Sequence, residues 1–328
     1  MSKEREKTWR SASNAFSHEE NRRARLDAFF ERFSELVRPV DLKTVSTMGV
    51  GDFGMVATVP DLEKLRELVL FCRTIELAWL PLGGASNCLF PDGILGAVLV
   101  RLGEPFEEIS LEDGLVVCGA GASAAKLLNF SLANDLGGLE ILAGLPGTVG
   151  GALAGNAGAK DAGLADLAAE IEAVGTDGLP RTLRRGEFKS GYRFLGLPPE
   201  LEGSVVTRCR LELPRARREE TSSKVAELLA ARRRSQPMGA RSLGCVFKNP
   251  PGRSAGELID LCGLKGREVG GARISPVHAN FIVNLGGASS KDVLELAGLA
   301  RESVLKTHGV VLSLEIKALD RRGRLLFW

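Results

Sequence analysis

The feature that most constrains the folding of this chain is a stretch in which nine glycines stand between residues 137 and 163. The residues among them are mostly small, and the loop at residues 144–151 reads GLPGTVGG. Glycine has no Cβ, so it permits tight turns and close backbone approaches that other residues resist. We therefore expect this stretch to turn sharply or to let a ligand lie against its main chain.

A second turn of small residues, PLGGASN at residues 81–87, follows an apolar run that predicts a buried strand over residues 77–82. Its exposed N–H groups and the Ser86 hydroxyl could bind a diphosphate. The 144–151 loop lacks the Lys-Ser/Thr pair of a P-loop, which disfavours ATP or GTP hydrolysis. Either turn alone is more often structural, but two in one chain favour a dinucleotide held between them.

Two strings imitate the Rossmann fingerprint. Residues 49–54 (GVGDFG) lead into an apolar run and Pro60 where a helix should begin. Residues 119–124 follow a predicted strand and open a helix, but the acid about twenty residues on, Glu140, precedes an apolar pair instead of closing a strand. A Rossmann domain is therefore disfavoured.

Composition narrows the classes of function. With 43 basic and 41 acidic side chains the net charge is only +2, so no global field would gather nucleic acid or anionic membrane. The six cysteines are scattered without a CxxC pair, which argues against metal sites and disulfides. The charged N-terminal segment lacks an apolar core, so we expect a cytoplasmic protein.

Periodicity and capping residues predict a mixture of helices and strands. Residues Phe29, Phe30, Phe33, Leu36 and Val37 recur at helical spacing. Further helices are predicted at residues 61–70, 123–134, 224–234, 255–262 and 290–307, and strands at 97–101, 115–118, 205–213, 281–285 and 310–319. Gly137 and Gly309 are the expected glycine stops of the 123–134 and 290–307 helices.

Four side chains are candidates for chemistry. Cys245 is by default an inert buried thiol, but beside Lys248 it could donate protons with a pKa near the usual ~8.5. Glu315 lies in an apolar strand, where a carboxylate needs a partner or a proton. Arg193 is either a surface charge or a bidentate ligand for a carboxylate. His278 reads more simply as a structural hydrogen-bonding residue than as a base.

Several strings occur in an order that resembles the UDP-N-acetylenolpyruvoylglucosamine reductase family. They are GGASN, GLEILAGLPGTVGGALAGNAGA, GYR, GCVFKNP, LKGREVGGARISPVHANFIVN and GVVLSLEIK. The resemblance runs from about residue 44 to residue 319, and its short interval between Arg193 and Gly244 is similar to the family type without an extra substrate-covering loop.

The resemblance implies an α+β protein with an FAD-binding fold of the vanillyl-alcohol oxidase (PCMH) type. It implies an N-terminal extension at residues 1–38, flavin-binding subdomains at 39–100 and 101–214, and a UDP-sugar substrate domain at 215–328 whose final strand returns to the flavin domains. Implied cofactor contacts are Gly83, Gly84, Ala85, Ser86, Asn87, Gly144, Pro146, Gly147, Thr148, Gly150, Gly151, Asn156 and Gly158.

The implied reaction is the NADPH-dependent, FAD-mediated reduction of UDP-N-acetylglucosamine enolpyruvate to UDP-N-acetylmuramate in peptidoglycan synthesis. Hydride reaches C3 of the enolpyruvyl group from the flavin, and a proton must reach C2. By motif position Cys245 matches the proton donor, and Arg193 and Glu315 match the groups that stabilise the substrate carboxylate as it takes up charge. Implied substrate contacts are Tyr192, Arg193, Lys248 and Asn249. The expected partner is a small UDP-sugar, with no metal, nucleic acid or membrane, and the chain is expected to be a monomer.

The chain departs from the family pattern at several positions. Cysteine stands at residue 245 where the family usually has serine, and glycine at residue 49 where the first flavin segment usually has arginine. The usual NAGAYG ends here as Asn156-Ala-Gly-Ala-Lys-Asp, and Leu195 replaces a serine after the GYR motif. Two alternatives therefore stay open: a flavin oxidoreductase with a changed substrate, and a non-catalytic homologue that binds a nucleotide or a UDP-sugar.

Overall fold

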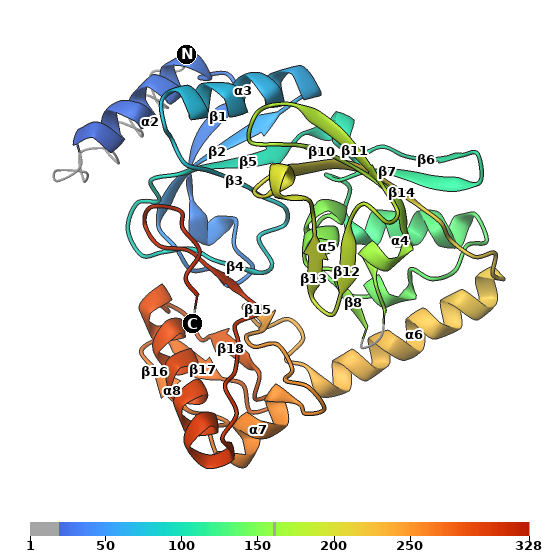
Figure 1. Ribbon diagram of the computed structural model, residues 1–328. Coiled ribbons are helices and arrows are strands. Elements are labelled where there is room, and N and C mark those ends of the chain that lie inside the picture. The colour runs from blue at the N-terminus through green and yellow to red at the C-terminus, as the bar shows by residue number, and fades with distance from the viewer. Residues whose placement is uncertain (1–19, 160–161, 328) are drawn as a thin grey trace.

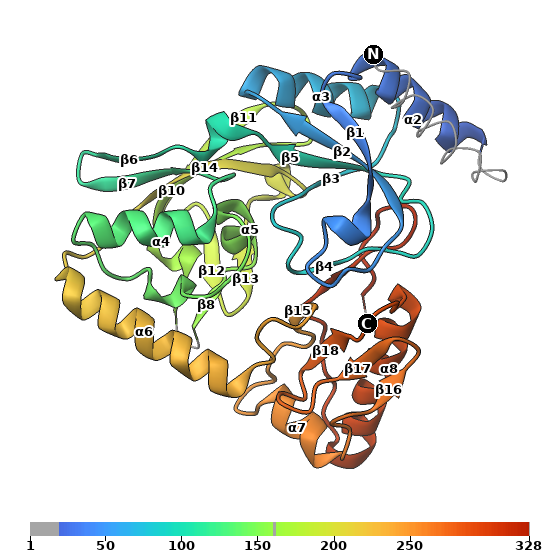
Figure 2. The same ribbon diagram turned by 180° about the vertical axis from the view of Figure 1, so that it is seen from behind.

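The structure, a computed structural model, describes residues 20–159 and 162–327. Three sheets with their helices surround the centre of the molecule (Figure 1), and the view from behind shows the same three units (Figure 2). The α+β class predicted from the sequence is confirmed. The part of the predicted N-terminal extension before residue 20 lies outside the described residues.

The first sheet has the order β1-β2-β5-β3, with β1 antiparallel to β2 and the other neighbours parallel. Its elements are α2 (Glu20–Arg32), β1 (Val37–Asp41), β2 (Phe53–Val59), α3 (Leu62–Thr74), β3 (Trp79–Pro81) and β5 (Val98–Leu102). The helices cover one face, where the rings of Phe29 in α2 and of Phe33 just after it contact the ring of Phe71 in α3. The Asp61 side chain caps α3, as the sequence predicted.

The predicted N-terminal helix was wrong at its C-terminal end. α2 ends at Arg32, and Val37 already belongs to strand β1. Pro39, two residues after Val37, prevents the helix from continuing into this segment. It has no N–H and disfavours a helical conformation at the residue before it. The chain therefore turns after Phe33 and enters the sheet.

The second sheet is antiparallel throughout, in the order β11-β10-β14-β7-β6. Its elements are β6 (Ile109–Glu112), β7 (Leu115–Gly119), α4 (Ala124–Ala133), α5 (Val149–Ala154), β10 (Ala168–Val174), β11 (Pro180–Arg184), β14 (Val205–Leu211) and α6 (Arg218–Ser235). α4 begins after its Ser123 cap as predicted, but Asn134, not Gly137, is its C-cap. A Cβ at Gly119 would overlap the Phe106 carbonyl, so this glycine of the Rossmann-like string serves packing.

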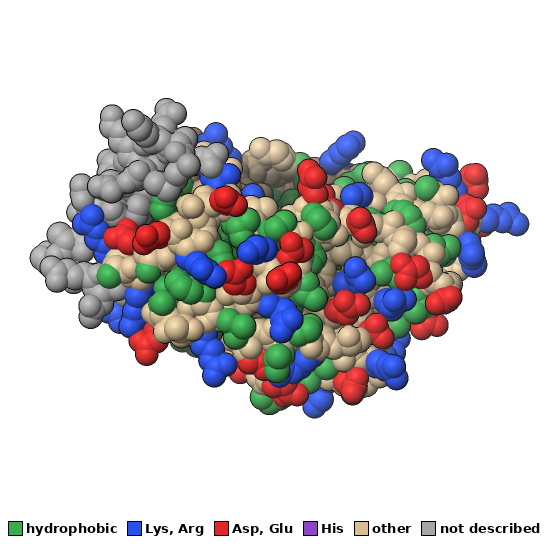
Figure 3. Space-filling view, turned by 90° about the horizontal axis from the view of Figure 1, so that it is seen from above, with side chains coloured by type: hydrophobic (Ala, Val, Ile, Leu, Met, Phe, Trp, Pro, Cys, Tyr) green, Lys and Arg blue, Asp and Glu red, His purple; other side chains and the backbone are tan. Residues whose placement is uncertain are grey.

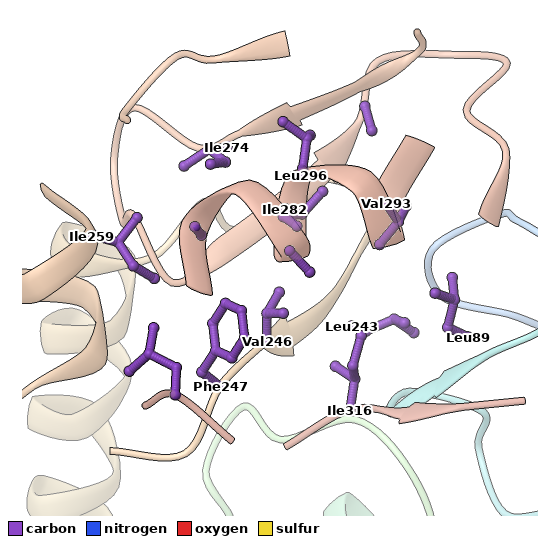
Figure 4. Close-up of a cluster of buried hydrophobic side chains, with 14 of the residues drawn as sticks. Leu89, Leu243, Val246, Phe247, Ile259, Ile274, Ile282, Val293, Leu296 and Ile316 are labelled. Atoms are coloured by element: carbon purple, nitrogen blue, oxygen red, sulfur yellow. The ribbon is translucent and has the colours of Figure 1, made fainter. Parts of the chain in front are cut away.

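The third sheet is antiparallel, in the order β15-β18-β17-β16. Its elements are β15 (Ser242–Cys245), α7 (Ala255–Leu261), β16 (Glu268–Val269), β17 (Ala272–Ile274), β18 (Phe281–Asn284) and α8 (Ser290–His308). α8 ends at Gly309, which has a left-handed φ of 67°, so the predicted glycine stop is confirmed. In Figure 4 side chains of β15, β18, α7 and α8 meet in one core with Leu89 and Ile316.

The predicted strand over residues 310–319 was wrong as a continuous strand. Only β19 (Lys317–Ala318) is a strand, and it pairs in parallel with β4 (Cys88–Leu89) beside the first sheet. Before it, the chain runs beside residues 246–248, which follow β15: the Lys248 N–H donates to the Ser313 carbonyl at 2.9 Å, and the Glu315 N–H donates to the Val246 carbonyl at 2.8 Å. The segment thus divides its pairing between two partners.

The remaining elements are short. The small strands are β8 (Gly158–Ala159), β9 (Ala162–Gly163), β12 (Lys189–Gly191) and β13 (Phe194–Gly196), and the 3-10 helices are η1 (Leu42–Thr44), η2 (Glu104–Glu107), η3 (Glu140–Leu142), η4 (Leu164–Leu167) and η5 (Pro199–Leu201). Within residues 20–159 and 162–327, every helix is too short or too polar to cross a membrane. The face seen in Figure 3 carries basic and acidic side chains interspersed.

Candidate functional site

The two glycine loops singled out in the sequence lie against each other. A Cβ added to Gly84 would lie 2.6 Å from the Cα of Gly147, and one added to Gly83 would lie 2.6 Å from the Thr148 Oγ1. The Ser86 hydroxyl donates to the Pro146 carbonyl at 3.1 Å. The loops therefore form one continuous backbone surface between the first and second sheets.

This surface has the chemistry of a diphosphate cradle. Among the described residues, the N–H groups of residues 83–87, and those of Gly147 and Thr148, have no hydrogen-bond acceptor. Ala85 has a left-handed φ of 51° and Gly147 a φ of 118°. Successive unpaired N–H groups around such a turn form a concave site for anions. The residues present therefore fit the diphosphate of a dinucleotide such as FAD.

Three of the other predicted cofactor residues have local packing duties. Gly144 lies against Leu229 of α6, where a Cβ would be 2.9 Å from the leucine side chain. The Gly150 N–H donates to the Ala120 carbonyl at 2.8 Å. Gly158 forms the tight β8–β9 hairpin with Gly163. Gly144 thus lets the loop lie close to α6, and Gly150 holds it beside the end of β7.

Asn156 connects the glycine-rich segment to the loop that carries Arg193. It is buried, its side-chain NH₂ donates to the Gly191 carbonyl at 2.9 Å, and its side-chain oxygen accepts the Ala165 N–H at 2.8 Å. Its side chain is thus engaged with protein groups. The predicted cofactor residue Asn156 therefore holds the GYR loop in place.

Arg193 and Glu315 meet although they are far apart in sequence. The Arg193 Nε donates to Glu315 Oε1 at 2.6 Å, with 25% and 17% of the two side chains exposed. Arg193 has a left-handed φ of 52° and its guanidinium lies 5.4 Å from the centre of the Tyr192 ring. A non-glycine residue in this region is strained, and such strain concentrates at functional sites.

Burial raises the pKa of Glu315, and the charges of Arg193 and Lys248 oppose that rise. The partner that the sequence required for this carboxylate is therefore Arg193. Lys248 lies near the same pair, and its ammonium donates to the Arg193 carbonyl oxygen at 3.5 Å. Two cations thus face one half-buried carboxylate.

Cys245 ends strand β15 next to this pair. Burial, followed by the Glu315 charge, raises the pKa of its thiol to about 12, against the opposing effect of the Arg193 charge. The prediction that the Cys245 thiol, beside Lys248, has a pKa near its ordinary value was wrong, because burial raises that pKa. The Lys248 ammonium donates to the Arg193 carbonyl instead. The thiol is therefore protonated at neutral pH.

The predicted substrate residues Tyr192 and Asn249 lie together at the rim. The Asn249 N–H donates to the Tyr192 hydroxyl oxygen at 3.2 Å, and its side-chain oxygen accepts the Ala255 N–H at the start of α7 at 2.9 Å. Tyr192 is 44% exposed. These contacts join the GYR loop to the third sheet across the site.

Sequence reasoning missed two residues at this site. Arg232 of α6 had been treated only as part of a basic helix, yet burial and the nearby charge of Arg193 lower its pKa, and it donates to the Ile141 carbonyl at 3.2 Å. Asn280 binds the main chain directly after Cys245. Its position two residues after His278, in a turn before an apolar strand, was the available signal.

Comparisons with known proteins agree with this architecture. Residues 54–184 match the FAD binding domain family, and residues 236–319 match the family described as UDP-N-acetylenolpyruvoylglucosamine reductase, C-terminal domain. The first match includes both glycine loops, and the second includes Cys245 and Glu315.

Full-length relatives are similar over most of the chain. A UDP-N-acetylenolpyruvoylglucosamine reductase from Heliobacterium modesticaldum is 36% identical, over 87% of this chain and 90% of the relative. One from Myxococcus xanthus is 40% identical, over 73% of this chain and 77% of the relative. The crystal structure of a UDP-N-acetylenolpyruvylglucosamine reductase from Thermus caldophilus aligns with a TM-score of 0.75 and 40% identity, over 86% of this chain and 98% of that one.

Proposed function

Because this chain belongs to the UDP-N-acetylenolpyruvoylglucosamine reductase family and contains an FAD-binding domain, we propose that it reduces UDP-N-acetylglucosamine enolpyruvate to UDP-N-acetylmuramate with NADPH as the hydride donor. The observation that carries the proposal is the Arg193–Glu315 ion pair beside the Cys245 thiol. This cluster lies next to the glycine loops, since Asn87 of one loop donates to the Glu315 carbonyl at 3.2 Å.

The glycine loops would bind the cofactor, and the cluster would act on the substrate. The unpaired N–H groups of residues 83–87 would hold the diphosphate of FAD, together with Gly147 and Thr148. Bound FAD, reduced by NADPH, would supply the hydride that C3 of the enolpyruvyl group receives. The side chains of the cluster would then serve the carboxylate and C2 of the substrate.

Arg193 and Lys248 would bind the substrate carboxylate. A planar guanidinium can pair with both oxygens of a carboxylate, and an ammonium adds a second positive charge. As C3 gains hydride, negative charge develops over C2 and the carboxylate, and these cations stabilise it. Glu315, with a raised pKa, orients the guanidinium and lies within the same site.

Cys245 would donate the proton that C2 requires. A thiol with a pKa of about 12 is fully protonated at neutral pH, so it carries the proton that it would donate. The carbanionic centre formed at C2 is a much stronger base than a thiolate, and the transfer is therefore downhill. A thiol is also more acidic than the serine hydroxyl that the family usually has here, so donation is chemically competent.

Anaerobic spectroscopy tests the proposal directly. The purified protein, saturated with FAD, would be mixed first with NADPH and then with UDP-N-acetylglucosamine enolpyruvate. We expect the flavin bands to bleach with NADPH and to return with the sugar nucleotide. Bleaching without return would point to another substrate, and failure to retain added FAD would refute the enzymatic proposal.

Replacing Cys245 by alanine separates the two half-reactions. In Cys245→Ala the rate of flavin reduction by NADPH should stay within about twofold of the parent, whereas reoxidation by the enolpyruvyl substrate should fall by about 10²-fold or more, the usual contribution of a general acid. Stopped-flow absorbance would follow each step. Equal reoxidation rates in variant and parent would remove Cys245 from the reaction.

A further inference from the structure

The Asn280 side chain is paired with the main chain of Phe247, two residues after Cys245. Its oxygen accepts the Phe247 N–H at 2.9 Å, and its NH₂ group donates to the Phe247 carbonyl at 2.8 Å. The Asn280 carbonyl also accepts the Val246 N–H at 2.8 Å. Asn280 is 2% exposed, so these bonds form away from water. Asn280 thus satisfies three main-chain groups of the two residues that follow Cys245: both N–H groups and the Phe247 carbonyl.

The orientation of this amide is determined by its partners. An N–H can only donate and a carbonyl can only accept, so the Phe247 main chain requires the Asn280 oxygen on one side and the nitrogen on the other. One of the two N–H bonds of the Asn280 nitrogen is used for the Phe247 carbonyl. Among the described residues, the second N–H has no further main-chain acceptor.

The segment that Asn280 holds also carries the rest of the site. Val246 and Phe247 point their side chains into the core of the third sheet (Figure 4), which leaves the Cys245 thiol at the edge of that core. The Val246 carbonyl accepts the Glu315 N–H at 2.8 Å. The positions of the Cys245 and Glu315 main chains therefore depend on the same two residues.

Asn280 also acts on the thiol itself. A hydrogen bond from Asn280 lowers the pKa of Cys245, against the rise that burial and the Glu315 charge produce. A donor to sulfur favours the thiolate over the thiol, because the anion accepts a stronger hydrogen bond. This is the state of the sulfur after it has given up its proton.

We propose that Asn280 is a positioning residue for proton donation: it fixes the loop that presents the Cys245 thiol and donates an N–H to the sulfur as the proton leaves. The S–H bond breaks, the proton forms the new C–H bond at C2 of the substrate, and the electron pair stays on sulfur as a thiolate that water later reprotonates. This inference rests on the proposed role of Cys245.

The test compares two buried asparagines four residues apart. Asn280→Asp keeps the oxygen that accepts the Phe247 N–H but removes the donor and adds a carboxylate near the thiol. The matched control is Asn284→Asp, because Asn284 is also buried and donates to the Met48 carbonyl at 2.9 Å and accepts the Gly286 N–H at 2.8 Å. It holds a different loop.

We expect Asn280→Asp to slow flavin reoxidation by the enolpyruvyl substrate at least about tenfold, the effect of losing a hydrogen bond to a developing charge. Flavin reduction by NADPH should stay within about twofold of the parent. Asn284→Asp should leave the ratio of the two rates unchanged. Equal reoxidation in Asn280→Asp and parent, or the same change of ratio in Asn284→Asp, overturns the proposal.

A second measurement does not depend on turnover. Iodoacetamide alkylation of Cys245, followed by mass spectrometry of its peptide at several pH values, reports the fraction of thiolate. Asn280→Asp should shift this profile to higher pH, while Asn284→Asp should not. If Asn280→Asp does not fold, the smaller variant Asn280→Ser, which removes the amide without adding charge, provides the same comparison. An unshifted alkylation profile in the variant that folds refutes the role of Asn280 as a donor to the thiol.

The two readouts distinguish failure of this inference from failure of the proposed function. If the parent protein is not reoxidised by the enolpyruvyl substrate, the proposed function fails. The alkylation profile then still decides whether Asn280 controls the thiol. If the parent is reoxidised and neither readout changes in the Asn280 variants, the proposed function stands and the inference falls.

Discussion

Gly84→Ala should weaken FAD binding by pushing the two glycine loops apart. The added Cβ would lie 2.6 Å from the Cα of Gly147 and 3.3 Å from its nitrogen. Non-bonded carbon atoms are attracted at about 3.5–4.0 Å, so the loops must separate by about 1 Å to accommodate one methyl group. That separation would widen the cradle in which the N–H groups of both loops converge.

The magnitude follows from the cost of overpacking. An extra methyl group forced against backbone costs about 1–3 kcal/mol, and here the two loops can relieve it by moving apart at the expense of the ligand. Each 1.4 kcal/mol is a factor of ten in affinity, so the FAD dissociation constant should rise by about 5- to 150-fold. Ser86 would lose its 3.1 Å bond to the Pro146 carbonyl in the same movement.

The assay is a fluorescence titration of the apoprotein with FAD. The matched control is Gly155→Ala at the C-cap of α5, where a Cβ would meet only the Gly151 carbonyl oxygen at an ordinary 3.6 Å. The control should bind FAD within about twofold of the parent, because contacts at this distance are not repulsive. An unchanged affinity in Gly84→Ala would refute the idea that the apposed loops form the cradle, as would an equal loss in Gly155→Ala.

Three further predictions concern the cluster and the stability of the fold. Glu315→Gln should leave flavin reduction by NADPH intact and slow flavin reoxidation by the substrate about tenfold or more, because Arg193 loses its charged partner. Loss of FAD by this variant would instead indicate a structural role for Glu315. Burial raises the pKa of the Cys72 thiol from 9.0 to about 12, so the unfolded chain loses this proton at lower pH than the folded protein does. The free energy of unfolding therefore falls as pH rises between these two values, by up to about 1.4 kcal/mol per pH unit for this thiol. Urea unfolding from pH 8 to 10 should show a shallower decline of this free energy for Cys72→Ala. Gly298→Ala, in α8 where a Cβ would meet nothing within 4 Å, should raise the free energy of unfolding by about 0.5–1 kcal/mol, and a urea midpoint that falls would contradict it.

Local signals predicted the elements whose ends are set by neighbouring residues. Ser123 marked the start of α4, and Gly309 marked the end of α8, because a cap acts within one turn of the helix it bounds. The predicted strand at residues 310–319 failed for the opposite reason. Its pairing is shared between the 246–248 segment and β4, and no periodicity within one segment reveals which partners it will find.

In the candidate site, too, the chemistry of single residues was predictable from the sequence, whereas contacts between distant segments were not. Residue chemistry singled out Arg193 and Glu315 separately, but their contact spans 122 positions and depends on two loops from different sheets. Lys248 was assigned to Cys245 because it is close in sequence, whereas in space it donates to the Arg193 carbonyl. Asn280 was missed because an asparagine before a strand has no distinctive chemistry until its partners are known. The roles of these residues in the reaction stay predictions.

The return of the chain at β19 divides the site into two mechanical parts. The Asn87 side chain holds the Glu315 carbonyl, and the Val246 carbonyl holds the Glu315 N–H, so Glu315, Cys245 and the 83–87 loop form one frame. Arg193 lies in the turn of the β12–β13 hairpin, which is tied to Asn156. A rigid-body displacement of this hairpin against this frame would therefore change the 2.6 Å ion pair before it changed the distance between thiol and carboxylate. In such a displacement the bonds from Asn87 and Val246 to the Glu315 main chain would keep the thiol and the carboxylate at the same separation.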